Sequence, residues 1–196
     1  MSNPLKRDPM RSVARARGAS AGYSLVEILI VVALIAILTA FGFLRVDRAG
    51  AQVDSQVQAL AFAMDAAQRE ALFQQHDVRL IFDVDARRVV VHRDDNNDGS
   101  IQPGERQTPI QLEDGVEFGL HGSDGLPWGT DPVTFREVGG NPTLIYHRNG
   151  SASEFGAVYI TSLRPETELN RAIEVERATG AVRCFRYSSG SWSLTC

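Results

Sequence analysis

The chain has 196 residues, of which 43% are apolar and 22% are charged, so it can form one medium-sized domain with a hydrophobic core. The net charge of −4 is unevenly distributed, because residues 1–22 are basic and residues 23–196 carry 15 Lys or Arg against 23 Asp or Glu. An acidic chain of this kind is a poor generic binder of nucleic acid or anionic lipid.

The N-terminal part of the chain combines a basic leader with a long apolar segment. Residues 1–22 contain five basic side chains and one acidic side chain, and Ile28–Leu44 contains no charge. Counted from Leu25, the apolar run has 20 residues, about the length of an α-helix that crosses the ~30 Å hydrocarbon core of a bilayer. The positive leader predicts that this end stays in the cytoplasm. Glu27 is costly within such a segment, so it is a candidate functional residue with a partner.

The order of these features resembles the class III leader of type IV prepilins and type II secretion pseudopilins. In that family a basic leader ends in glycine, an aromatic residue follows, and the fifth mature residue is glutamate, as in Gly22, Tyr23 and Glu27. The resemblance implies that a prepilin peptidase cleaves after Gly22 and methylates the Tyr23 amine. It also implies that Glu27 neutralises the N-terminal amine of a neighbouring subunit during assembly. The alternative is a plain signal anchor in which Glu27 has no role. Translation from Met10 would give a 13-residue leader, which is more typical of the family.

After Arg48 the chain is predicted to continue as an amphipathic helix. No proline occurs between Pro9 and Pro103, so nothing forces the helix to end early. Apolar residues recur at intervals of three or four, as expected for one helical face: Val53, Val57, Leu60, Met64, Ala67 and Ala71. We therefore expect a membrane or filament-core segment at residues 23–45, followed by an amphipathic segment at residues 46–75.

From Val78 the apolar period changes from that of a helix to that of a strand. The runs 78–82 and 88–92 flank a turn and predict a β-hairpin. Further strands are predicted at 116–120, 133–136, 143–147, 157–163, 172–177 and 181–187, with Thr179-Gly180 as a turn between the last two. One helix followed by seven or eight strands predicts an α+β fold, with an extracytoplasmic β-rich domain at residues 76–196.

This pattern resembles the GspH/FimT branch of the pilin-like family, in which a long N-terminal helix packs on an antiparallel β-sheet domain. The resemblance is strongest at residues 17–75 and weaker at 143–152 and 173–184. If the leader places the C-terminal domain outside the cytoplasm, the compartment is oxidising and a disulfide between Cys184 and Cys196 is expected. A disulfide that closes a loop of this length stabilises a fold by about 3 kcal/mol.

An acidic loop is the sharpest local motif in the predicted β-rich domain. Residues 94–105 fit the calcium-loop pattern D-x-[DN]-x-[DN]-G-x5-E in full. The pattern assigns the ligands to side-chain oxygens, one backbone carbonyl and a closing bidentate carboxylate, here Asp94, Asn96, Asp98, Ser100 and Glu105. A strand precedes the loop, and Pro103-Gly104 precludes a regular exiting helix, so the context differs from an EF-hand. The alternative is a solvated acidic loop without an ion.

The predicted C-terminal hairpin is a second candidate binding site. FimT-type proteins resemble DNA-uptake pilins through a G-R-x-R motif, and here Gly180–Arg183 matches only half of it. Arg177, Arg183 and Arg186 would contact DNA if they form one basic patch. The alternative is that these arginines pair with neighbouring glutamates across the sheet.

Catalysis has no support in the sequence, since the four histidines are scattered and no nucleophile or phosphate-binding motif occurs. The sequence predicts a non-enzymatic minor pilin or pseudopilin (H-type) without a required cofactor, Ca²⁺ being the one candidate. Its predicted partners are other pilin or pseudopilin subunits, a prepilin peptidase, the inner-membrane assembly platform and, before assembly, membrane lipid. The expected location is the bacterial inner membrane, with a periplasmic C-terminal domain, and then a pilus or pseudopilus. The alternatives are a FimT-like DNA-binding minor pilin for natural transformation and a membrane-tethered enzyme or sensor.

Overall fold

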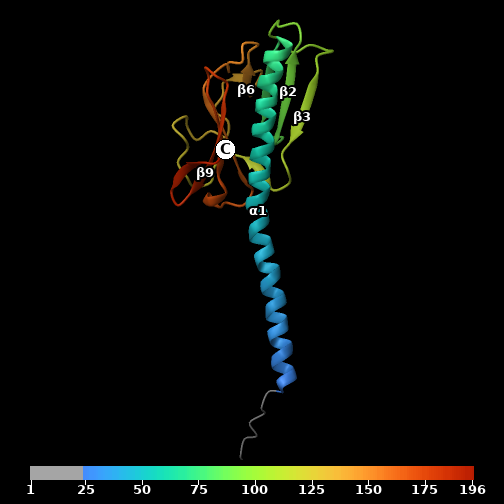
Figure 1. Cartoon of the computed structure of the whole chain (residues 1–196), viewed down its shortest axis with the longest axis vertical. Helices are drawn as coiled ribbons and strands as arrows, with labels where there is room; N and C mark the ends of the chain where they lie inside the picture. Colours follow the sequence, from blue (N-terminus) through green and yellow to red (C-terminus); the bar gives the residue numbers. More distant parts are fainter. Residues whose placement is uncertain (1–23) are drawn as a thin grey trace, which may run out of the picture. The chain divides into compact units, whose positions relative to one another are not determined.

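The computed structural model describes residues 24–196, and for residues 40–47 it describes the backbone only. The chain divides into two compact units, Met1–Gly42 and Phe43–Cys196. Helix α1 (Leu25–Gln74) contributes to both units (Figure 1). Within the described part of the chain, no helix has both the length and the apolar character needed to cross a membrane. The predicted leader lies outside the described residues, and the predicted segment 23–45 lies partly outside them.

Local chemistry sets both ends of α1. At the N-terminus, the Val26 N–H donates to Ser24 Oγ at 3.3 Å, which is the interaction of an N-cap serine. At the C-terminus, Gln75 adopts a left-handed conformation with φ of 59°, and its side-chain amide donates to the Leu72 carbonyl at 2.6 Å. Such a residue ends a helix because the chain leaves the helical path while the last carbonyls keep donors.

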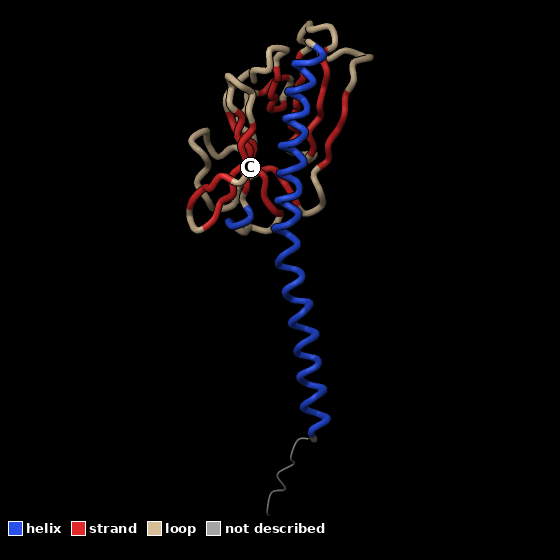
Figure 2. Tube along the Cα trace, in the orientation of Figure 1, coloured by secondary structure: helices blue, strands red, loops and turns tan. Residues whose placement is uncertain are grey.

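Ten strands form two antiparallel sheets in the described residues (Figure 2). The first sheet has the order β3-β2-β1-β6-β5, formed by β1 (Asp77–Asp83), β2 (Arg88–Asp94), β3 (Gln107–Gln111), β5 (Glu137–Val138) and β6 (Asn141–Tyr146). The second has the order β10-β9-β8-β7-β4, formed by β4 (Val116–Phe118), β7 (Gly156–Ser162), β8 (Arg171–Val175), β9 (Val182–Ser188) and β10 (Ser191–Leu194). A 3₁₀ turn, η1 (Thr167–Leu169), precedes β8.

The α+β fold is confirmed, with two corrections at the level of single strands. The predicted strand 133–136 is wrong: Val133 forms one isolated bridge to Val158, and Pro132 just before it has no N–H to extend the pairing. Strands β3, β5 and β10 were not predicted, so the count of seven or eight was too low. Pro109 inside β3 hid that strand, although proline is tolerated there because β3 is an edge strand.

The main hydrophobic core lies where α1 packs on the sheets. The six residues predicted to form the apolar face of the helix are 0–5% exposed: Val53, Val57, Leu60, Met64, Ala67 and Ala71. They belong to one cluster with buried residues of β1, β2, β6, β7 and β8. In Figure 1, this part of α1 is flanked by β2 and β3 on one side and by β6 and β9 on the other. The helical periodicity therefore predicted the core face of α1 correctly.

Strands β7 and β8 of the second sheet are covered on both faces. Every residue of β7 and of β8 is buried. On one face, Val158 and Ile160 join the main core, and on the other, Ala157 and Tyr159 pack in a smaller cluster with Leu126. The Tyr159 hydroxyl accepts from the Leu126 N–H at 2.7 Å and donates to the Gly129 carbonyl at 2.8 Å. These bonds fix the loop that closes the outer face.

Candidate functional site

Residues 25–39 of α1 form an exposed apolar helix. Its large apolar side chains between Leu25 and Leu38 are 47–80% exposed in the described residues. One side of this helix carries a row with helical spacing: Leu25, Ile28, Leu29, Val32, Ala33 and Ala36. A contiguous apolar surface of this kind marks a contact with lipid or with another protein.

Glu27 is the one carboxylate within residues 25–39, and it lies in the first turn of α1. The unpaired N–H groups at a helix N-terminus favour a negative charge at this position. Glu27 is exposed, so its carboxylate is accessible to a cationic group from another molecule. The predicted cleavage and methylation residues, Gly22 and Tyr23, lie outside the described residues. Their roles stay predictions.

The two cysteines form the expected disulfide. Cys184 in β9 and Cys196 at the C-terminus are bonded, with their Cα atoms 4.9 Å apart. Cys184 is 1% exposed and belongs to the main core. The Thr195 N–H also donates to the Cys184 carbonyl at 2.8 Å. The bond therefore fixes the last residues of the chain against the packed side of β9.

Gln68 of α1 joins two turns that are far apart in the sequence. Its side-chain amide donates to the Gly150 carbonyl at 2.8 Å and to the Thr179 carbonyl at 2.5 Å. Gly150 and Gly180 have φ values of 83° and 68°, which favour glycine. The two weaker segments of family resemblance, 143–152 and 173–184, thus meet at one helical residue. Sequence reasoning missed Gln68, whose only signal was a polar position beside the apolar helical face.

The arginines predicted to bind DNA do not form one patch. Arg183 and Arg186 are three positions apart on β9, so their side chains leave opposite faces of the sheet. Arg183 Nη2 lies 2.9 Å from Glu174 Oε1 on the neighbouring strand β8. Arg186 Nη2 lies 2.7 Å from Asp54 Oδ2 of α1. Arg177 follows β8 and is exposed. The cross-strand pairing raised as the alternative is observed for Arg183.

Asp54 bridges two arginines of the second sheet. Besides Arg186, it accepts from Arg171 Nε at 2.5 Å through Oδ1. The Arg171 side chain is 5% exposed and also donates to the Glu168 and Asn170 carbonyls, at 2.8 and 2.9 Å. A buried guanidinium requires such partners because an unpaired buried charge is costly. Asp54 therefore holds α1 to β8 and β9, and no pattern in the sequence predicts this pairing.

The acidic loop 94–105 connects β2 to β3. Its first and last residues, Asp94 and Glu105, each contact one basic side chain. Asp94, at the end of β2, is 1% exposed and lies 2.7 Å from Arg79 Nη2. Glu105 Oε2 lies 2.8 Å from His92 Nε2. The pKa of Glu105 lies below its usual value, because the Gln102 N–H, and then the His92 ring, stabilise its charged form. Among the described residues, no three Asp, Glu, His or Cys side chains converge as a metal cluster.

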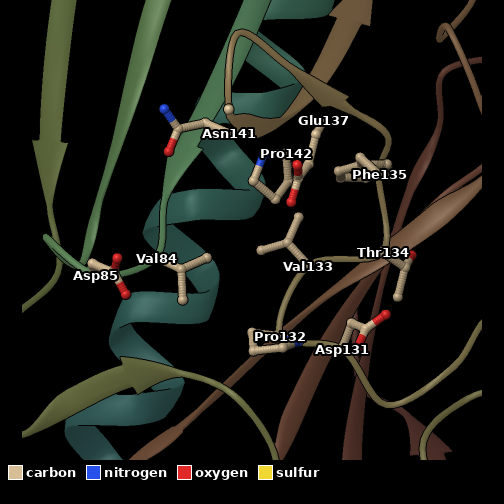
Figure 3. A pocket seen from close by; sticks show the side chains of 11 residues that line it. Val84, Asp85, Asp131, Pro132, Val133, Thr134, Phe135, Glu137, Asn141 and Pro142 are labelled. Carbon is tan, nitrogen blue, oxygen red and sulfur yellow. The ribbon is translucent and has the colours of Figure 1, made fainter.

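A cleft of about 550 Å³ opens between the β1–β2 turn and the segment 131–135 (Figure 3). Val84 and Val133 face one another in it, and Asp85, Asp131 and Glu137 add carboxylates to the lining. No histidine, cysteine or serine lines this cleft.

The chain was compared with protein-family models, with curated protein sequences and with solved structures. Residues 17–43 match the family model of the prokaryotic N-terminal methylation motif. This match confirms the predicted likeness to pilin-like proteins at the level of that motif. No curated protein sequence matches the chain.

Solved structures of a pseudopilin resemble the fold. One structure of the minor pseudopilin EpsH from the type 2 secretion system of Vibrio cholerae has a TM-score of 0.47 and 15% identity, covering 71% of this chain and 99% of that chain. A second structure, a crystal structure of EpsH from the same organism, has a TM-score of 0.47 and 19% identity. The match covers 68% of this chain and 92% of that chain.

Proposed function

We propose that the protein is a non-enzymatic, H-type minor subunit of a pilin-like filament. The filament is the pseudopilus of type II secretion or a type IV pilus, and the subunit supports protein secretion or pilus biogenesis. The observation that carries the proposal is the methylation motif at residues 17–43, because it coincides with an exposed apolar helix that holds a single carboxylate in its first turn.

Before assembly, the apolar helix is held in the lipid of the inner membrane, with its N-terminus in the cytoplasm and residues 76–196 in the periplasm. A prepilin peptidase removes the leader after Gly22 and methylates the amine of Tyr23. The inner-membrane assembly platform then transfers the subunit to the filament, where the apolar side chains pack against neighbouring subunits. Burial of ~25 cal/mol per Å² of apolar surface stabilises this packing.

Glu27 sets the position of the subunit in the filament. Its carboxylate pairs with the N-terminal amine of a neighbouring subunit, so that neither charge is buried alone. A helix placed one turn out of position would leave both charges without partners in an apolar surrounding.

The test is assembly in cells that produce the filament. Glu27→Ala is expected to leave membrane insertion intact and to remove the subunit from sheared filaments, whereas Asp114→Ala, which removes an exposed carboxylate of the β-rich domain, is expected to assemble normally. Mass spectrometry of the membrane-bound chain should find a methylated N-terminal Tyr23. Normal assembly of Glu27→Ala, or an intact leader in assembled subunits, would contradict the proposal.

The DNA-uptake alternative stays a prediction with a weaker basis. Arg183 and Arg186 are paired with carboxylates on opposite faces of the sheet, which lowers the positive potential available to phosphate. A gel shift of the purified chain at ~50 mM salt, abolished by Arg183→Ala, would favour it. The absence of a wild-type shift at that salt would exclude it.

A further inference from the structure

The backbone of the loop 94–105 is folded around Asp94. Asp94 Oδ1 accepts from the Asp98 N–H at 3.1 Å, and Oδ2 accepts from the Gly99 N–H at 2.9 Å. Gly99 has a φ of 83°, a conformation that favours glycine. Asp94 and Gly99, the first and sixth residues of the calcium-loop pattern, are therefore already hydrogen-bonded to each other.

Arg79 orients Asp94 through only one of its two oxygens. Its Nη2 lies 2.7 Å from Oδ2, the oxygen that also accepts from Gly99. Oδ1 has a single backbone donor, so it keeps a lone pair for a further partner. Side chains that hydrogen-bond a ligating carboxylate in this way fix its direction and support metal binding.

Glu105 provides an independent sign of a missing cationic partner. Its side chain is 8% exposed, and while Oε2 accepts from His92 and from the Gln102 N–H, Oε1 is buried without any partner. A buried carboxylate oxygen without a partner is costly. Calcium loops use the carboxylate at this position through both oxygens, so a bound ion would supply the partner that Oε1 lacks.

Gln102 connects Glu105 to the opposite side of the loop. Its backbone N–H donates to Glu105 at 2.8 Å, and its side-chain amide donates to Asp98 Oδ2. Gln102 therefore donates hydrogen bonds to both carboxylates, that of Glu105 and that of Asp98. A divalent cation bound between these two carboxylates would neutralise their charges.

We propose that the loop 94–105 binds one Ca²⁺ ion. The ligands are the side chains of Asp94, Asn96, Asp98 and Glu105, together with the Ser100 carbonyl. As the three carboxylates stand, they do not converge closely enough to hold a metal, so binding draws the exposed residues 95–102 towards Glu105. The mixed set of carboxylate, amide and carbonyl oxygens suits calcium, whereas Mg²⁺ requires a stricter octahedron and retains its waters. This site is independent of filament assembly.

The experiment uses the purified full chain in detergent after treatment with EDTA. Because sites of extracellular modules bind Ca²⁺ with Kd values of about 10⁻⁴–10⁻³ M, 10 mM CaCl₂ should raise the melting temperature by about 3–6 °C. Equilibrium dialysis with radioactive calcium should give one ion per chain. MgCl₂ at 10 mM should give a clearly smaller shift.

Two loop variants and one control distinguish this site from general charge effects. Glu105→Gln and Asp98→Ala should each abolish the shift, and Asp114→Asn, which removes an exposed carboxylate outside the loop, should retain it. Asp98 is exposed, so its variant tests the proposal even if Glu105→Gln unfolds the domain. No calcium shift in the wild type, an equal shift with magnesium, or calcium binding retained by Asp98→Ala would overturn the proposal.

Discussion

Two stretches of helix α1 use apolar residues in opposite ways. Between Leu25 and Leu38, the large apolar side chains are 47–80% exposed, whereas the apolar face from Val53 to Ala71 is 0–5% exposed. The difference follows from pattern, because the first stretch is apolar on all sides and the second only on one. Within the described residues, only the second finds its partner in the same chain. The first must find it outside, and this is why we propose lipid and neighbouring subunits.

The largest expected difference in the free energy of unfolding is between two Leu→Ala substitutions, one in each stretch of α1. Leu60→Ala should lower the free energy of unfolding by about 2–5 kcal/mol, because it leaves a cavity in the core. Leu29→Ala should change it by less than about 0.5 kcal/mol, since Leu29 is 62% exposed. Urea denaturation of both variants in detergent measures the contrast. Equal losses would show that residues 25–39 are buried within the same molecule.

The disulfide tests how firmly the C-terminus supports the packed stretch of α1. Cys196→Ser should lower the stability by about 3 kcal/mol, since the closed loop no longer restricts the unfolded chain. Dithiothreitol should lower the wild-type melting temperature to that of the variant and leave the variant unchanged. A reductant effect on the variant would point to a second cause.

Gly180 tests the clamp formed by Gln68. A Cβ added at Gly180 would overlap the Gln68 amide and the Gly150 carbonyl, so Gly180→Ala should cost about 2–3 kcal/mol. Gly190 is the matched control, because its φ of 82° is similar but nothing lies within 4 Å of an added Cβ. Gly190→Ala should cost only the backbone strain, about 1 kcal/mol. Equal losses in thermal melts would mean that the clamp contributes nothing.

The smallest expected effect is at Asp54, which holds the packed stretch of α1 to the second sheet. Asp54→Asn keeps the shape but removes the charge that faces Arg171 and Arg186, and should cost about 1–2 kcal/mol. Because Asp54 is partly exposed, the loss should decrease in 1 M NaCl. Asp114→Asn should show neither effect, and a loss equal to that of Asp54→Asn would indicate a general response to net charge.

Most helices and strands with a regular spacing of apolar residues could be predicted from the sequence. Repeats of three and four fixed the buried face of α1, and alternation located β1 and β2 with their turn. Short or irregular elements could not be predicted, as shown by β5 with two residues and by β3 with an internal proline. Their pairing depends on a neighbouring strand that is distant in the sequence.

The candidate sites could be predicted only as sets of residue types. The pattern D-x-N-x-D-G identified the loop after β2, but not that Arg79 and His92 would contact its first and last carboxylates. The spacing of Arg183 and Arg186 left a single basic patch open, although alternation along one strand separates their side chains. The predicted strand 181–187 already contains both residues, so alternation along it was sufficient to separate them.

The sequence by itself determined the apolar helix with its early carboxylate, the amphipathic helix after it, and the identity of the only two cysteines. These depend on local order along the chain, which periodicity and spacing record directly. Only the tertiary structure decided that Gln68 joins the turns at Gly150 and Gly180, that Asp54 joins Arg171 and Arg186, and that β7 is buried on both faces. The contacts of Gln68 and Asp54 join residues separated by 82 to 132 positions, so they exist only once the two sheets pack around α1.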